Sequence, residues 1–154
     1  MENTSRKETA IALFEKGYNC CQSVVLAYAD LLAPDQTDLA RLASSFGGGV
    51  GRLREICGAV SGMAAVLGLL YGYSGPETGP VKAEHYSLIQ NAAKEFEERN
   101  GSLICRELLN LTEKHDEPTP EPRTPAYYHN RACSTFVGNA AEILERLIAE
   151  KKVL

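Results

Sequence analysis

One segment of the sequence, from Ile56 to Tyr73, constrains the fold more than any other part of the chain. It contains no charged residue and is largely apolar all around a helix, so neighbouring helices must cover it on every face. Small residues recur in it at four-residue steps, Gly58 with Gly62 and Ala64 with Gly68. This spacing would let another helix approach closely. The sequence therefore predicts a buried central helix.

Helical periodicity also marks the segments around this central helix. Apolar residues at three- and four-residue steps predict helices over residues 4–16, 20–32, 37–46, 81–100, 102–109 and from about 130 onward. Four prolines predict a Pro-rich loop at 116–126, and no segment shows the alternation of a strand. We therefore expect an all-α fold, a single domain over residues 1–154 with about five to six helices in a bundle.

The charge pattern limits the partners that this chain is expected to bind. The formal net charge is -4 and no run of Lys or Arg is present, which argues against nucleic acid and anionic membrane surfaces. The polar segment Met1–Lys7 has no secretory signal, and glycines dilute the apolar segment, so we expect a cytoplasmic protein without membrane insertion. The glycine-rich central helix leaves room for a homodimer.

Five cysteines, Cys20, Cys21, Cys57, Cys105 and Cys133, are dispersed along the chain without a C-x-x-C pair. In a reducing compartment a structural disulfide framework is improbable, so catalytic, redox or metal-binding roles gain weight against that of inert buried thiols. Any joint site must be assembled by the fold.

The predicted helix starts place four of these cysteines in first turns. With Asn19, Ser102 and Asn130 as N-caps, Cys20 is the first helical residue, while Cys105 and Cys133 are each the third. Cys57 lies near the start of the central helix. Such positions favour thiolate, which is both a nucleophile and a soft metal ligand. Cys21 lies on the apolar stripe of its helix instead, and we interpret it as a core residue.

A glycine cluster precedes the central helix. Gly48, Gly49, Gly51 and Arg52, with Arg54 nearby, could form a backbone nest that binds an anionic ligand or cofactor. The cluster lacks the pattern of a P-loop or a dinucleotide fold, and a structural loop that permits close helix packing is the preferred interpretation. In either case it would form a wall of a cysteine-lined pocket.

Three motifs, at residues 19–24, 46–52 and 57–62, are followed in the chain by the lone Cys105 and Cys133. In this order they resemble the bacterial and archaeal family of redox-active proteins named for its C, GCAxxG, C, C cysteine pattern. The resemblance implies a helical protein that uses Cys20, Cys57, Cys105 and Cys133. In this chain the glycine follows Cys57 instead of preceding it, and Cys21 stands where the family usually has a small residue.

The preferred hypothesis is a cysteine-dependent redox protein, and one form of it is a thiol oxidoreductase. Cys57 is the leading nucleophile because of its motif, with Cys20, Cys105 or Cys133 as the resolving partner. It requires no cofactor and would act on a small molecule or a redox partner protein. The alternative is a binding protein in which the same four thiolates hold zinc or an iron–sulfur cluster. A helical interaction domain with inert thiols is the third possibility.

Overall fold

The structure is a computed structural model that describes residues 4–76, 79–113 and 115–153. The first three residues of the polar N-terminal segment lie outside the described residues. Within this part of the chain the backbone forms eight α-helices, two 3₁₀ helices and no strand, so the all-α prediction is confirmed. None of the helices found there is both long and apolar enough to cross a membrane.

The α-helices follow one another in this order: α1 (Arg6–Glu15), α2 (Cys20–Leu26), α3 (Gln36–Ala43), α4 (Gly58–Tyr71), α5 (Pro80–Asn100), α6 (Cys105–Leu108), α7 (Pro125–Asn130) and α8 (Cys133–Val153). The 3₁₀ helices are η1 (Ala29–Leu31) and η2 (Ser44–Phe46). The α-helices of the described residues exceed the predicted five to six because the short segments α6 and α7 form helices of their own.

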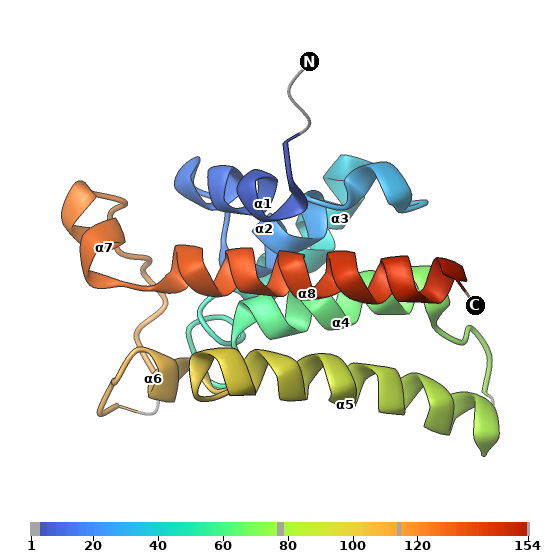
Figure 1. Ribbon diagram of the computed structural model, residues 1–154. Helices are drawn as coiled ribbons and strands as arrows, with labels where there is room; N and C mark the ends of the chain where they lie inside the picture. Colours follow the sequence, from blue (N-terminus) through green and yellow to red (C-terminus); the bar gives the residue numbers. More distant parts are fainter. Residues whose placement is uncertain (1–3, 77–78, 114, 154) are drawn as a thin grey trace.

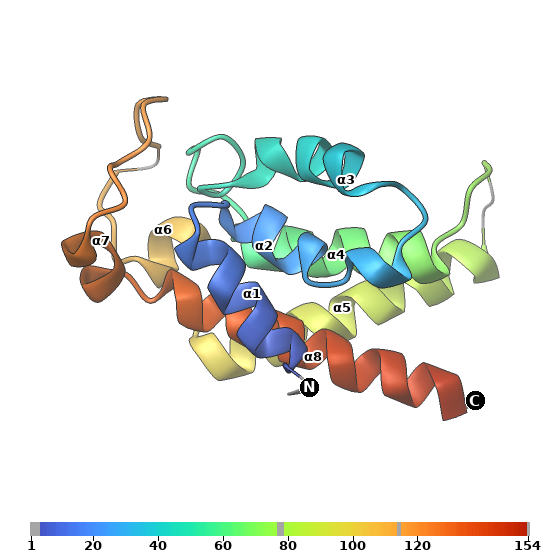
Figure 2. The same cartoon turned by 90° about the horizontal axis from the view of Figure 1, so that it is seen from above.

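The long C-terminal helix α8 is the centre of the packing and contacts α1, α2, α4 and α5 (Figure 1). Helices α4 and α8 run in the same direction, whereas α5 runs in the opposite direction and leads into α6. Seen from above, α1 crosses over α8, and α2 lies beside α4 (Figure 2). The starts of α2, α4, α6 and α8 therefore lie toward one end of the molecule.

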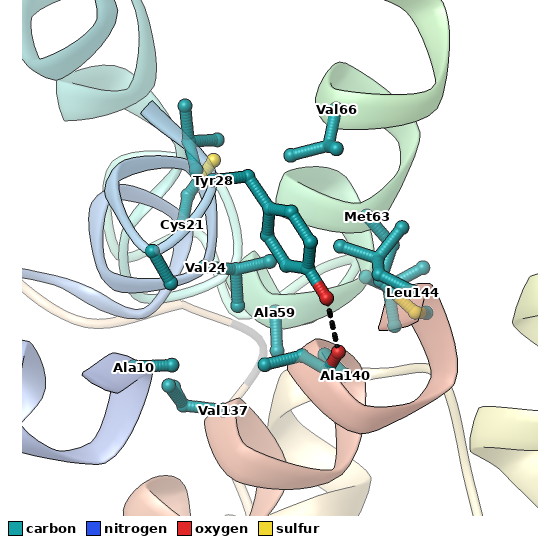
Figure 3. Close-up of a cluster of buried hydrophobic side chains, with 14 of the residues drawn as sticks. Ala10, Cys21, Val24, Tyr28, Ala59, Met63, Val66, Val137, Ala140 and Leu144 are labelled. Atoms are coloured by element: carbon teal, nitrogen blue, oxygen red, sulfur yellow. Dashed lines mark hydrogen bonds between the residues drawn. The ribbon is translucent and has the colours of Figure 1, made fainter. Parts of the chain in front are cut away.

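Tyr28 lies in the core between α4 and α8, with 1% of its surface exposed (Figure 3). Its hydroxyl donates a hydrogen bond of 2.6 Å to the carbonyl oxygen of Ala141 in α8. A buried tyrosine requires such a partner, because an unpaired hydroxyl in an apolar environment is costly. This bond joins the segment after α2 to the middle of α8.

The predicted central helix is α4, but it is less completely buried than the sequence indicates. It spans Gly58–Tyr71, and Leu69 is 42% exposed. A Cβ on Gly62 would lie 2.8 Å from Val24 Cβ, so this glycine permits the close approach of α2. A Cβ on Gly68 would meet no atom within 4 Å. The close packing that was expected from both small-residue pairs is therefore confirmed for the first pair only.

Capping residues displaced one predicted helix start and shortened the predicted Pro-rich loop. Asp35 caps α3, so this helix begins one residue before the predicted start. The Pro-rich loop expected at 116–126 ends earlier, because Thr124 caps α7 and Pro125 takes a first-turn position that suits proline. Extended backbone at Arg131 then separates α7 from α8.

Cys105 and Cys133 are the first residues of α6 and α8, not the third as predicted. Ile104 occupies the N-cap position of α6 without a side-chain cap, and its amide donates to the hydroxyl oxygen of Ser102 outside the helix. The predicted first position of Cys20 is confirmed, because Asn19 and Gln22 form a reciprocal capping box at the start of α2.

Candidate functional site

Four of the five cysteines line one cavity of about 480 Å³ at the end of the molecule where α2, α4, α6 and α8 begin. They are the four predicted site residues, Cys20, Cys57, Cys105 and Cys133. The fifth, Cys21, is 1% exposed and lies in the hydrophobic core, as predicted. All five are free thiols. The fold therefore assembles residues that are far apart in the sequence.

The missing side chain of Gly58 brings the starts of α2 and α4 together. A Cβ on this residue would lie 3.0 Å from Cys20 Cβ and 3.1 Å from the amide nitrogen of Cys21. A larger residue would push the two helices apart. The glycine that follows Cys57 in the motif thus sets the position of Cys57 relative to Cys20.

A short antiparallel bridge places Cys57 next to Cys105. Ile56 pairs with Ile104 in this bridge. The amide of Cys57 donates to the carbonyl oxygen of Leu103 over 2.8 Å. The amide of Cys105 donates to the carbonyl oxygen of Glu55 over 2.6 Å. The bridge couples the residues just before α4 to those just before α6. The sequence did not predict this bridge, because a single bridge leaves no periodic pattern in the sequence.

The glycine cluster forms a left-handed turn in which residues 48–52 all have φ between +54° and +71°. Val50 and Arg52 are not glycine, and a β-branched residue such as Val50 is strained at such an angle. A Cβ on Gly49 would lie 2.8 Å from Cys105 Cβ. The turn thus forms a wall of the cavity through Gly48, Gly49, Gly51 and Arg52, as expected.

Most amides of this turn already have backbone partners. The N–H of Gly51 donates to Ser45 O over 2.8 Å, and that of Arg52 to Gly47 O over 3.2 Å. The amides of Arg54 and Glu55 donate to Gly48 O and Gly49 O. These donors are not available for an anion nest, which favours the structural interpretation of the cluster. A ligand could reach the guanidinium groups of Arg52 and Arg54 instead.

Arg54 follows the turn and is almost completely buried, with its side chain 3% exposed. Its Nη1 donates to Cys105 Sγ over 3.5 Å, and its Nε donates to Asp116 Oδ2 over 3.0 Å. The Nη2 atom lies 2.9 Å from the same carboxylate oxygen, close enough for charge attraction, but its geometry forms no hydrogen bond. Arg54 thus combines a buried positive charge with an unused donor at the cavity.

Cys20 and Cys133 form the one thiol pair in which the two pKa values move apart. The interaction between the two thiols raises the pKa of Cys20 and is the largest cause that lowers the pKa of Cys133. Burial opposes the lowered pKa of Cys133, whereas the positive charges of Arg131, Arg54 and Arg123 add to the effect of Cys20. Its position as the first residue of α8 acts in the same direction.

The other cavity cysteines differ from the expectation that their helix starts would favour thiolate. Burial raises the pKa of Cys57 to about 12, and neighbouring backbone amides only partly offset it. Burial also raises the pKa of Cys105, although the hydrogen bond from Arg54 opposes this effect. Removal from water thus outweighs the advantage of the helix N-terminus at these two positions.

The sequence interpretation did not identify two arginines that line the cavity, Arg123 and Arg131. Arg123 lies among the prolines and stacks on the rings of Phe14 and Tyr127, at 4.4 Å and 4.9 Å from their centroids. Arg131 stands two residues before Cys133 and forms an ion pair with Glu121. The only signal in the sequence was that cations occur near the last cysteine, and no spacing rule connects such cations with a site.

The distribution of donor atoms also bears on the metal-binding alternative. Across the residues that the structure describes, no group of three or more Cys, His, Asp or Glu side chains is placed to hold a metal ion. Three of the cavity thiols, Cys20, Cys57 and Cys105, have raised pKa values, whereas metal ligation requires thiolate.

The fold and the site define a class of protein, an all-α protein with four cysteines and four arginines around one cavity. Sequence comparison agrees with this class. The profile of the family described as "Putative redox-active protein (C_GCAxxG_C_C)" matches residues 18–147, and the chain belongs to this family. No curated protein and no solved structure matches the chain.

Proposed function

We propose that this protein is a thiol-dependent redox protein in which Cys133 is the nucleophile and Cys20 the resolving thiol. The observation that carries the proposal is that these two residues line one cavity, where the neighbouring Cys20 thiol lowers the pKa of Cys133. A thiolate is the attacking species in disulfide exchange, and a neighbouring protonated thiol can then complete the reaction. The sequence motif ranked Cys57 first, but its pKa of about 12 favours Cys133 instead.

The reaction consumes one disulfide and two protein thiols. The Cys133 thiolate attacks a substrate disulfide, so that a mixed disulfide forms and one substrate thiolate leaves. Cys20 then loses its proton and attacks the Cys133 sulfur, which releases the second substrate thiolate. The substrate gains two electrons, and the protein retains a Cys20–Cys133 disulfide. A dithiol reductant must return the protein to its reduced form.

A small disulfide oxidant tests this proposal on the purified full-length chain. We expect the loss of two titratable thiols, a Cys20–Cys133 linkage in peptide mapping, and recovery of both thiols with excess dithiol. Cys133→Ser should abolish the reaction, whereas Cys20→Ser should stop it at the mixed disulfide. Cys21→Ala is the matched control, because Cys21 lies next to Cys20 but faces the core.

Three outcomes would contradict the proposal. If Cys57→Ser abolishes reversible oxidation and Cys133→Ser does not, the nucleophile is Cys57. About one equivalent of tightly held metal, lost when the four cavity cysteines are alkylated, would support the metal-binding alternative. Slow and unselective thiols in the native protein would support the interaction domain with inert cysteines.

A further inference from the structure

We infer that the cavity selects small substrates that carry an anionic group, which Arg54, Arg123 and Arg131 bind beside Cys133. The redox step of such a substrate rests on the function proposed above, but the anion site itself does not. It follows from the charge, burial and unused hydrogen-bonding capacity of the cavity wall.

The first observation is the incomplete satisfaction of Arg54. Its side chain is 3% exposed and lines the cavity, and the buried Nη2 atom, although 2.9 Å from Asp116 Oδ2, forms no well-oriented hydrogen bond. An unsatisfied donor on a buried cation is costly, and native proteins usually satisfy such a group. An oxyanion in the cavity would supply the missing acceptor, because a guanidinium presents its donors in a fork that matches carboxylate geometry.

The second observation is the excess of positive charge. Arg52, Arg54, Arg123 and Arg131 line the cavity, whereas Glu121 is its one acidic lining residue in the described chain. Asp116 contacts Arg52 and Arg54, and it offsets only part of the excess. A cavity with walls of one charge sign concentrates ligands of the opposite sign.

Arg123 contributes most clearly to this excess. Among the described residues it has no carboxylate partner; its Nη1 donates to Phe14 O over 3.0 Å and its Nη2 to Tyr18 O over 3.2 Å. Stacking on Phe14 and Tyr127 holds the guanidinium plane in place. Neutral carbonyls and rings leave its full charge uncompensated beside the cavity.

The dimensions of the site favour a small molecule over a protein partner. The cavity volume of about 480 Å³ lies in the range of small-ligand sites. Cys133 is 7% exposed, so a disulfide on the surface of another protein would not reach its sulfur. The substrate class that fits is a small disulfide or thiol with a carboxylate or a similar oxyanion.

Two alkylating reagents of similar size, iodoacetate and iodoacetamide, separate anion binding from simple activation of the thiol. Both react with the same thiolate, so the nucleophilicity of Cys133 cancels in the ratio of the two rates. If the arginines only lower the pKa of Cys133, removing one of them slows both reagents equally. If the arginines bind an anion, removing one of them slows the reaction with iodoacetate more than the reaction with iodoacetamide.

The ratio is measured at Cys133 by peptide mass spectrometry, in the native chain and in the chain unfolded in urea. At low salt we expect the ratio of the iodoacetate rate to the iodoacetamide rate to be about tenfold higher in the native chain than in the unfolded chain. In the native chain this ratio should fall steeply at high salt. Arg123→Gln should reduce the native ratio several-fold. Arg99→Gln is the matched control, because Arg99 pairs with Glu95 and Glu142 and does not line the cavity.

Equal ratios in the native and unfolded chains would overturn the inference, as would a ratio that Arg123→Gln leaves unchanged. If Arg123→Gln does not fold, Arg131→Gln and the salt dependence of the native ratio test the same point. A preference for iodoacetate without a reversible Cys20–Cys133 disulfide would retain the anion site and refute the proposed function. A reversible disulfide without that preference would support the proposed function and refute the anion site.

Discussion

Arg54 Nη1 lies 3.5 Å from Cys105 Sγ and joins the end of the left-handed turn to the first residue of α6. The same guanidinium binds Asp116, which follows α6 in the chain. One side chain thus holds together the strained turn, the short helix and the proline-rich segment. Backbone strain such as that at Val50 persists only where surrounding contacts fix it, and Arg54 provides such contacts.

We therefore expect Arg54→Lys to destabilise the protein although the charge is kept. Lysine cannot donate in two directions from a planar group, so the contacts to Cys105 and Asp116 cannot both survive. The expected loss is about 1–3 kcal/mol in the free energy of unfolding, measured by urea denaturation. Arg99→Lys, at an exposed ion pair, should cost less than about 1 kcal/mol. Equal losses in both variants would contradict this role for Arg54.

The pH dependence of Cys133 alkylation should reveal its interaction with Cys20. Because the pKa of Cys133 is lowered from the ordinary thiol value of 9.0, its rate should reach half of the maximum below that value. Cys20→Ala removes this neighbouring thiol and should move the midpoint upward, whereas Cys21→Ala should leave it in place. The measurement is the alkylation rate at Cys133 between about pH 6 and pH 10. An unchanged midpoint in Cys20→Ala would rule out this coupling.

Two glycines of α4 should respond oppositely to alanine. A Cβ on Gly62 would lie 2.8 Å from Val24 Cβ and 3.2 Å from Cys21 O, so Gly62→Ala should force α2 away and cost about 1–3 kcal/mol. Gly68→Ala meets no atom within 4 Å and should stabilise the helix by about 0.5–1 kcal/mol. Thermal unfolding of both variants measures the difference. A stabilising Gly62→Ala would show that α2 and α4 are not in close contact there.

Buried thiols should make the protein less stable at high pH. Burial raises the pKa of Cys21 from 9.0 to about 12, so between these values the unfolded chain releases a proton that the folded chain retains. The free energy of unfolding should then fall by about 1.4 kcal/mol per pH unit for this group. Cys21→Ala should show a shallower fall above pH 9 in urea denaturation. Parallel curves for the two proteins would indicate that the Cys21 pKa is not raised.

Local sequence patterns determined most of the helical framework. Asn19 sets the start of α2 through its capping box, and Gly101 ends α5 in a left-handed conformation that favours glycine. The core position of Cys21 was also predictable, because it lies on an apolar stripe with helical spacing. Such features depend on residues within a few positions of one another. The four cavity cysteines could be selected in advance by motif and by their placement at helix starts.

Only the tertiary structure decided which cysteines lie next to one another in the site and how their pKa values differ. Gly58 brings Cys57 toward Cys20, and an isolated bridge sets Cys57 beside Cys105; both are contacts between distant segments. Burial raises the pKa of Cys57, whereas Cys20, together with charges from arginines elsewhere in the chain, lowers that of Cys133. A pKa depends on everything that surrounds the group in space. The sequence by itself therefore identified the four thiols, whereas only the fold brought them to one cavity and set their pKa values apart.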